Sequence, residues 1–234
     1  MHTMKWTSPP NRVTKRTVGF SSILILFLFL LAGSPGAAGA DFDSLMAQAK
    51  ASIEHEQYSD AIRIYSEALQ VLPDQPVKKI AAYSKRGEAY LHINEFKKAI
   101  DDYSEALRAL PPSKTFDDIR AEFYFNEGLA FDRLGDLPAA TENYTKCIDS
   151  YPQYVKAYNN RAVSNYKLNN FAAAIADVDS YLRFDTKWAG AYFIRGLSKV
   201  ALKDRSGVVD LKIAAGMGHK LAQEALAKAN IDWK

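Results

Sequence analysis

Residues 58–74, YSDAIRIYSEALQVLPD, and residues 96–112, FKKAIDDYSEALRALPP, repeat one pattern. In both stretches an aromatic residue stands three positions before Ala-Ile, and Tyr-Ser-Glu-Ala-Leu and then Leu-Pro follow. Side chains at offsets of 0, 4 and 7 lie on one face of a helix. Proline ends a helix because it lacks the N–H group and its ring clashes with the preceding turn. The pattern predicts an amphipathic helix that the chain uses more than once.

Aligned on the Ala of these stretches, four segments share the same columns of apolar and small residues. The columns are Ala61, Ala99, Ala140 and Ala174; Tyr65, Tyr103, Tyr144 and Val178; Ala68, Ala106, Cys147 and Tyr181; and Pro73, Pro111 and Pro152, with Thr186 departing. A preceding helix carries a small column, Ala49, Gly87, Gly128 and Ala162, and a large one four residues earlier, Leu45, Tyr83, Tyr124 and Tyr158. Neither helix of a pair can bury its apolar face alone, so the pairs are expected to stack.

These columns resemble the tetratricopeptide repeat, a two-helix unit of 34 residues. The resemblance implies an all-α, right-handed superhelical solenoid. We place regular units at 42–75, 80–113, 121–154 and 155–188, and a degenerate unit at 189–218 that resembles a Sel1-like repeat. Residues 219–234 are expected to form a capping helix and tail. The extra residues 76–79 and 114–120 are expected to lengthen a helix or a connector.

Several local features follow from the same alignment. We expect Asn94, Asp136 and Asn170 to cap the second helices of their units, and Thr115–Asp118 to form a capping box. Asp101 and Asp102 are expected on the surface, opposite the core face of their helix. Cys147, the single cysteine, stands in a buried column and is expected to act as a small apolar side chain.

Residues 1–40 are predicted to be a signal peptide. They hold four basic residues and no acidic one, the apolar run 20–33, and the small residues Ala38-Gly39-Ala40 before Asp41. Cleavage there predicts an exported protein, periplasmic or secreted, and an uncleaved membrane anchor is the alternative. The remaining chain has 26 basic and 27 acidic residues, which gives no footprint for nucleic acid. We expect no membrane partner once the signal peptide is cleaved.

Signatures of catalysis are missing from the sequence. It contains no H-E-x-x-H, paired cysteine or G-x-S-x-G motif, so we predict no metal, no cofactor and no enzymatic activity. Glu54-His55-Glu56 is expected to be a solvated helix end. The alternative of an enzyme needs a site assembled across units, such as Glu88, His92 and Asp132. Asn143-Tyr144-Thr145 has the form of a glycosylation sequon.

The resemblance implies that the first helices line a concave groove that holds a partner's peptide or helix. The predicted partner-binding residues are Lys85, Glu88, Phe125, Asn126, Leu129, Asn159, Asn160, Val163 and Phe193. Apolar members would receive an apolar segment, and the Asn side chains would bind its backbone. Alternatively, the final helix covers Phe193 to Val200.

One well-known form of this family grips the acidic C-terminus of cytosolic chaperones. Asn160 matches that clamp, but Phe125, Leu129, Gly190 and Ile194 replace its Lys, Asn and Arg residues. We therefore predict a non-catalytic extracytoplasmic scaffold that binds a protein or peptide. The alternative is a regulatory or targeting subunit of an envelope enzyme or of a secretion or assembly complex.

Overall fold

The computed structural model describes residues 37–71 and 75–233. Helices in these ranges are α2 (Ala37–Glu54), α3 (Tyr58–Gln70), α4 (Pro76–His92), α5 (Phe96–Ala109), α6 (Asp117–Leu134), α7 (Leu137–Ser150), α8 (Val155–Lys167), α9 (Phe171–Leu182), α10 (Ala189–Ala201), α11 (Gly207–Gly216) and α12 (Lys220–Lys228), with a 3₁₀ turn, η1 (Lys114–Phe116). The predicted signal peptide lies almost wholly outside the described residues. None of the described helices is long and apolar enough to cross a membrane.

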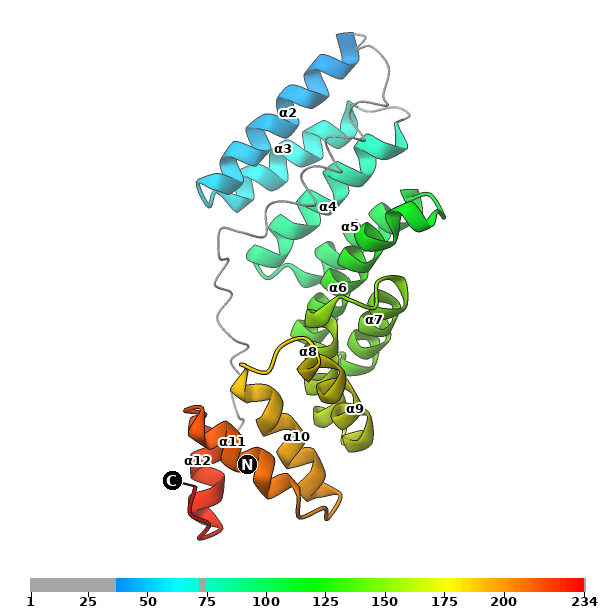
Figure 1. Ribbon diagram of the computed structural model, residues 1–234. Coiled ribbons are helices and arrows are strands. Elements are labelled where there is room, and N and C mark those ends of the chain that lie inside the picture. Colours follow the sequence, from blue (N-terminus) through cyan, green and yellow to red (C-terminus); the bar gives the residue numbers. More distant parts are fainter. Residues whose placement is uncertain (1–36, 72–74, 234) are drawn as a thin grey trace.

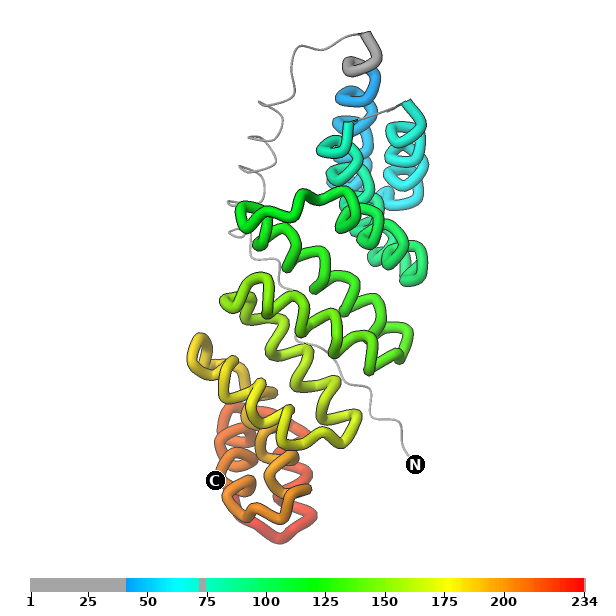
Figure 2. The backbone as a smooth tube through the Cα atoms, turned by 90° about the vertical axis from the view of Figure 1, so that its right-hand side faces the viewer, coloured from blue at the N-terminus to red at the C-terminus, as the bar shows by residue number. Residues whose placement is uncertain are grey.

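The helices pack in sequential pairs, from α2 with α3 to α10 with α11, and α12 follows the last pair. Figure 1 shows these pairs stacked along one elongated, twisting body, and Figure 2 shows the same succession from the side. This arrangement confirms the predicted all-α solenoid.

The small and large columns explain the close packing within each pair. Tyr65, Tyr103 and Tyr144 are at most 2% exposed. A Cβ atom added to Gly128 would lie 2.8 Å from two ring carbons of Tyr144, and one added to Gly87 would lie 3.2 Å from the ring of Tyr103. The glycines therefore make room for the tyrosine rings of the second helices.

The inserted residues extend helices and connectors, as predicted. Residues 76–79 form the first turn of α4, with Pro76 at its start. Residues 114–116 form η1, where the Ser113 hydroxyl accepts the Thr115 N–H. The predicted capping box at Thr115 is wrong, because α6 begins only at Asp117 and the η1 turn occupies the preceding residues.

The predicted helix caps are confirmed at one of three positions. The Asp136 carboxylate accepts the Ala139 N–H at 3.1 Å. Asn94 instead adopts a left-handed conformation (φ 61°) in the turn before α5, a region that Asn tolerates better than most residues. Asn170 directly precedes α9, but its side chain makes no capping hydrogen bond.

An arginine ladder, formed by Arg86, Arg161 and Arg195 and their hydrogen-bond partners, joins the units. Arg86 donates to both carboxylate oxygens of Asp102 at 2.7 and 2.8 Å, and to the hydroxyl of Ser66 on α3 at 2.9 Å. Arg161 contacts Asp177 and Thr145 in the same way, and Arg195 contacts Asp210 and Asp179. Each arginine thus links the second helix of its own unit to the second helix of the unit before.

The prediction that Asp102 lies on the surface is wrong, whereas Asp101 is exposed. Asp102 is 3% exposed because the guanidinium of Arg86 draws its carboxylate between the helices. The ladder is interrupted in the third unit. There Glu127 stands at the arginine position and Asn143 at the aspartate position, and the Ser104 hydroxyl donates to Glu127 at 2.5 Å.

The C-terminal helices close the end of the solenoid. Leu211, Ala214 and Ala215 of α11 pack with Ala222 and Leu226 of α12 in one apolar cluster. The exposed residues of α12 include Lys220, Glu224 and Lys228.

Candidate functional site

Eight of the nine predicted partner-binding residues form what we call the first-helix surface. They lie on the first helices of the second, third and fourth units: Lys85 and Glu88 on α4, Phe125, Asn126 and Leu129 on α6, and Asn159, Asn160 and Val163 on α8. All eight side chains are partly exposed. They share this position because they stand beside the buried small column of each helix.

Phe125 lies at the centre of this surface and is held by two tyrosines. Its ring centroid is 4.9 Å from that of Tyr154 and 5.8 Å from that of Tyr144, both in tilted geometry. Asn160 reaches the same tyrosine from α8, with its Nδ2 atom 3.5 Å from the Tyr144 hydroxyl. Side chains of α6 and α8 therefore converge on one buried tyrosine of α7.

The amides beside Phe125 are weakly bonded within the chain. The Asn159 Nδ2 atom is 3.4 Å from Asn160 Oδ1, so both amide contacts exceed the usual 2.7–3.2 Å. The Asn159 Oδ1 atom and the Tyr103 hydroxyl are buried and bond to no residue in the described ranges. Such atoms retain hydrogen-bonding capacity for another chain.

Charged groups gather at the N-terminal part of the first-helix surface. The Lys85 ammonium lies 2.8 Å from the Glu88 carboxylate. Burial lowers the pKa of Lys85, but the neighbouring carboxylates of Glu88 and Glu122 outweigh it, so the pKa is raised. Burial raises the pKa of the nearby Tyr65 to about 12. Lys85 therefore remains charged at neutral pH, and its ion pair with Glu88 forms a polar end beside the aromatic centre.

The assignment of Phe193 to the open groove is wrong. Its side chain is 2% exposed, and its ring stacks on His219 at a centroid distance of 4.3 Å. The alternative, that the C-terminal helix covers this region, holds for Phe193. It does not hold for Val200, which is 45% exposed.

The three residues considered for an enzymatic site, Glu88, His92 and Asp132, each contact a different neighbour. His92 stacks on Tyr58 at 4.4 Å, Glu88 pairs with Lys85, and Asp132 pairs with Lys167 at 3.2 Å. Within residues 41–71 and 75–233, no group of three His, Cys, Asp or Glu side chains is placed to hold a metal ion. Glu54, His55 and Glu56 are exposed, as predicted.

A pocket of about 550 Å³ lies on the second-helix side and was not predicted. Its walls come from α7 and α9 and its floor from α8; it is lined by Thr141, Glu142, Thr145, Lys146, Arg161, Asn165, Ala173, Ala176 and Asp177. The sequence held a pattern that could have indicated the Arg and Asp of this pocket. An Arg directly before the small column is followed by an Asp sixteen residues later, at Arg86 and again at Arg161.

Two other side chains on α7 are too buried to be modified or to react in the folded chain. Asn143 is 6% exposed and donates its Nδ2 to the Ala139 carbonyl, so the folded chain does not present the sequon for modification. Cys147 is fully buried, as predicted, and burial raises the pKa of its thiol to about 12. Both belong to the structure of the third unit.

The family model of the tetratricopeptide repeat matches residues 46–114 and 125–189, more than half of the chain. The chain therefore belongs to the tetratricopeptide repeat family. Proteins of this family generally mediate protein–protein interactions. The repeat framework is typically non-catalytic, and no catalytic domain is identified in the chain.

Relatives of known name match only over part of their length. Stress-induced-phosphoprotein 1 of Caenorhabditis elegans is 33% identical over 67 residues, which are 29% of this chain and 21% of that protein. Tetratricopeptide repeat protein 36 of Danio rerio is 28% identical over 103 residues, 42% of this chain and 55% of that protein. The matched segments thus span about a fifth and about half of these relatives.

Solved structures agree with the fold over most of the chain. YrrB, described as a TPR protein with an unusual peptide-binding site, has a TM-score of 0.67 at 17% identity and covers 81% of this chain and 97% of its own. A MamA protein has a TM-score of 0.66 at 20% identity and covers 83% of this chain and 98% of its own. These similarities establish the solenoid fold.

Proposed function

We propose that the protein is a non-catalytic, extracytoplasmic interaction module that binds a segment of a partner protein on its first-helix surface. One observation carries this proposal. An aromatic side chain, Phe125, is partly exposed between amides of Asn159 and Asn160 whose hydrogen bonds within the chain are long or unmade. YrrB, which has the same fold, is described as having a peptide-binding site.

The chemistry of the surface favours a segment that offers both an apolar side chain and free backbone groups. Phe125, Leu129 and Val163 provide apolar contact area across two successive first helices. Asn side chains both donate and accept hydrogen bonds, so they can pair with backbone N–H and C=O groups of an extended chain. Lys85 and Glu88 add a charged end that would fix the direction of the bound segment.

The extracytoplasmic location is part of the proposal and rests on the sequence of residues 1–40. A chain tagged at its C-terminus and recovered from the cell envelope should begin at Asp41 by intact mass. A recovered chain that retains residues 1–40 would favour the membrane anchor instead.

Partner capture tests the binding surface. The tagged chain is cross-linked in the envelope fraction, and Phe125→Glu and Asn160→Asp are each expected to abolish capture while the far-UV spectrum stays helical. Phe184→Glu is the matched control, because Phe184 is 53% exposed and lies outside the first-helix surface. Equal capture by wild type and both surface variants would refute the proposal. Stoichiometric recovery of one enzyme with the bait would identify the regulatory-subunit alternative.

A further inference from the structure

The outer side of α11 carries an apolar stripe that the repeat does not require. Val209, Ile213 and Met217 recur every four residues and are 60%, 40% and 40% exposed. The opposite side of the same helix is also apolar, since Leu211, Ala214 and Ala215 are in the core. Neighbouring exposed apolar side chains of this kind mark an interaction surface, so the exposed stripe of α11 calls for a covering surface.

Comparison with the third unit shows that the stripe is not a general feature of the repeat. Asp210 of α11 occupies the ladder position of Asn143 in α7, so Val209 and Ile213 correspond to Glu142 and Lys146. Those two residues of α7 form an ion pair at 2.7 Å. The same outer positions are therefore charged in the third unit and apolar in the fifth.

Two more apolar residues are exposed at the neighbouring end of α10 and in the turn between α10 and α11. Leu202 in this turn is 50% exposed, and Val200 at the end of α10 is 45% exposed. Val200 borders the start of α11, because a Cβ atom on Gly207 would lie 2.9 Å from its Cγ2 atom. We call this surface, made of Val200, Leu202, Val209, Ile213 and Met217, the α11 face.

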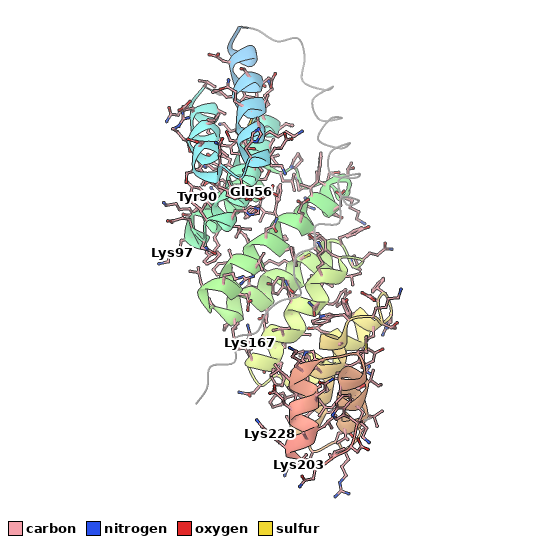
Figure 3. All side chains as sticks on the ribbon, turned by 90° about the vertical axis from the view of Figure 1, so that its left-hand side faces the viewer. Glu56, Tyr90, Lys97, Lys167, Lys203 and Lys228 are labelled. Carbon is pink, nitrogen blue, oxygen red and sulfur yellow. The ribbon has the colours of Figure 1, made fainter. Side chains whose placement is uncertain are left out.

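Basic residues surround the α11 face. Lys203, Arg205 and Lys212 are exposed, and none of them forms an ion pair with another residue in the described part of the chain. The one acidic residue of the turn, Asp204, accepts hydrogen bonds from Ser206. Figure 3 shows Lys203 and Lys228 at the same end of the molecule, far from Glu56 and Lys97 in the first two units.

Charge is divided unequally along the whole solenoid. Residues 189–234 hold eight Lys or Arg and four Asp or Glu, whereas residues 41–188 hold eighteen Lys or Arg and twenty-three Asp or Glu. The C-terminal unit is thus basic and the four regular units are acidic. An anionic surface would attract the C-terminal end and repel the rest, which orients the molecule end-on.

We propose that the α11 face docks on the surface of an anionic lipid bilayer. Exposed aliphatic side chains flanked by Lys and Arg are the chemistry of interfacial membrane binding. The face is formed by one helix and one turn at the end of the solenoid, and no residue of α10 to α12 lines the pocket between α7 and α9. A second copy of the chain is a poorer occupant, because a two-fold contact would bring the same cations together. This inference does not depend on binding at the first-helix surface.

A fluorescent probe on the α11 face tests this docking in the full chain. The variant Ile213→Cys carries an environment-sensitive probe, while Cys147 is fully buried and stays unlabelled in the wild-type control. Vesicles with equal parts of phosphatidylcholine and phosphatidylglycerol are expected to shift the probe emission to shorter wavelength, and vesicles of phosphatidylcholine alone to shift it far less. The same probe at Lys146→Cys, in the corresponding position of α7, is expected not to respond.

The cations provide the second measurement. Each Lys or Arg near an anionic surface strengthens binding roughly fivefold. Replacing Lys203, Arg205 and Lys212 together with Gln should therefore weaken vesicle binding on the order of a hundredfold. No shift at Ile213→Cys with anionic vesicles, or an equal shift at Lys146→Cys, would overturn the proposal. A shift that appears without vesicles and grows with protein concentration would overturn it in favour of a second copy.

Discussion

Replacement of Asp102 with Ala removes a buried carboxylate from the arginine ladder. Asp102 accepts two hydrogen bonds from Arg86 at 2.7 and 2.8 Å and is 3% exposed. Removing one partner of a buried ion pair costs about 3–5 kcal/mol, because the other charge is left uncompensated. Arg86 keeps its bond to Ser66, and its side chain is 19% exposed. Both facts place the expected loss at the lower end, about 3 kcal/mol.

Thermal and urea unfolding, followed by the far-UV helical signal, measure this loss. For a chain of this size a loss of about 3 kcal/mol lowers the midpoint by roughly 6–12 °C. The units of a solenoid open partly independently, so hydrogen exchange of α5 amides should localise the effect to the second unit. Asp101→Ala is the matched control, because the adjacent carboxylate is exposed and its loss should change stability by less than about 0.5 kcal/mol.

A paired replacement separates the ion pair from simple burial. The double variant Arg86→Leu with Asp102→Leu leaves no unpaired charge, so it is expected to be more stable than Asp102→Ala alone. Equal effects of Asp102→Ala and Asp101→Ala would refute the reasoning. A double variant whose loss equals the sum of the losses of Arg86→Leu and Asp102→Leu measured singly would refute it as well.

Two further predictions concern the third unit and use the same unfolding assays. Burial raises the pKa of Glu127 above its ordinary value of 4.5, so the folded wild type loses stability as the pH rises through that range. Glu127→Gln should gain stability relative to wild type from about pH 4.5 upward, and a difference that is constant with pH would contradict this. Gly128→Ala places a Cβ 2.8 Å from the ring of Tyr144. Overpacking costs about 1–3 kcal/mol and the better helix propensity of Ala returns about 1 kcal/mol, so the expected net loss is about 0–2 kcal/mol. Gly216→Ala, with nothing within 4 Å, should gain about 0.5–1 kcal/mol, and equal outcomes for the two glycines would exclude the steric cause.

The fold could be predicted because its main requirement is local and repeated. A small residue opposite a tyrosine ring lets two helices approach. The sequence contains this pair at Gly87 with Tyr103 and at Gly128 with Tyr144. The period of the repeat then determines the order of the helices. Helix starts were less predictable, because the turn before α5 places Asn94 in a left-handed conformation instead of using it as a cap.

Asp102 shows why the charged interior could not be predicted. Helical periodicity is read from one helix at a time. On that basis a charged side chain away from the apolar face is assigned to the surface. The partner of Asp102 is on α4, and that partner's third contact, Ser66, is on α3. Burial of this carboxylate is therefore a property of three packed helices, and it becomes visible in the sequence only when the Arg and Asp columns are compared between units.

Phe193 shows the corresponding limit for the candidate site. Its position in the repeat is the same as that of Phe125, and both were predicted to face a partner. Phe125 is partly exposed, whereas the residues that follow the fifth unit place His219 against the ring of Phe193. A repeat alignment assigns equivalent positions, but it does not contain the contacts made by the non-repeating end of the chain.

The third unit connects stability to the proposed binding surface through Tyr144. This unit lacks the ladder ion pair, since Glu127 and Asn143 stand in its place. Its two helices keep the other contact of the repeat, the Tyr144 ring that fills the space beside Gly128. Phe125 packs on the same ring, and Asn160 approaches its hydroxyl. A partner bound to Phe125 and Asn160 would thus hold in place a core side chain of the unit that lacks the ladder ion pair, and binding of the native state alone adds to its stability. Partner binding is therefore expected to stabilise α6 and α7 more than the helices of the second and fourth units, which the arginine ladder already joins.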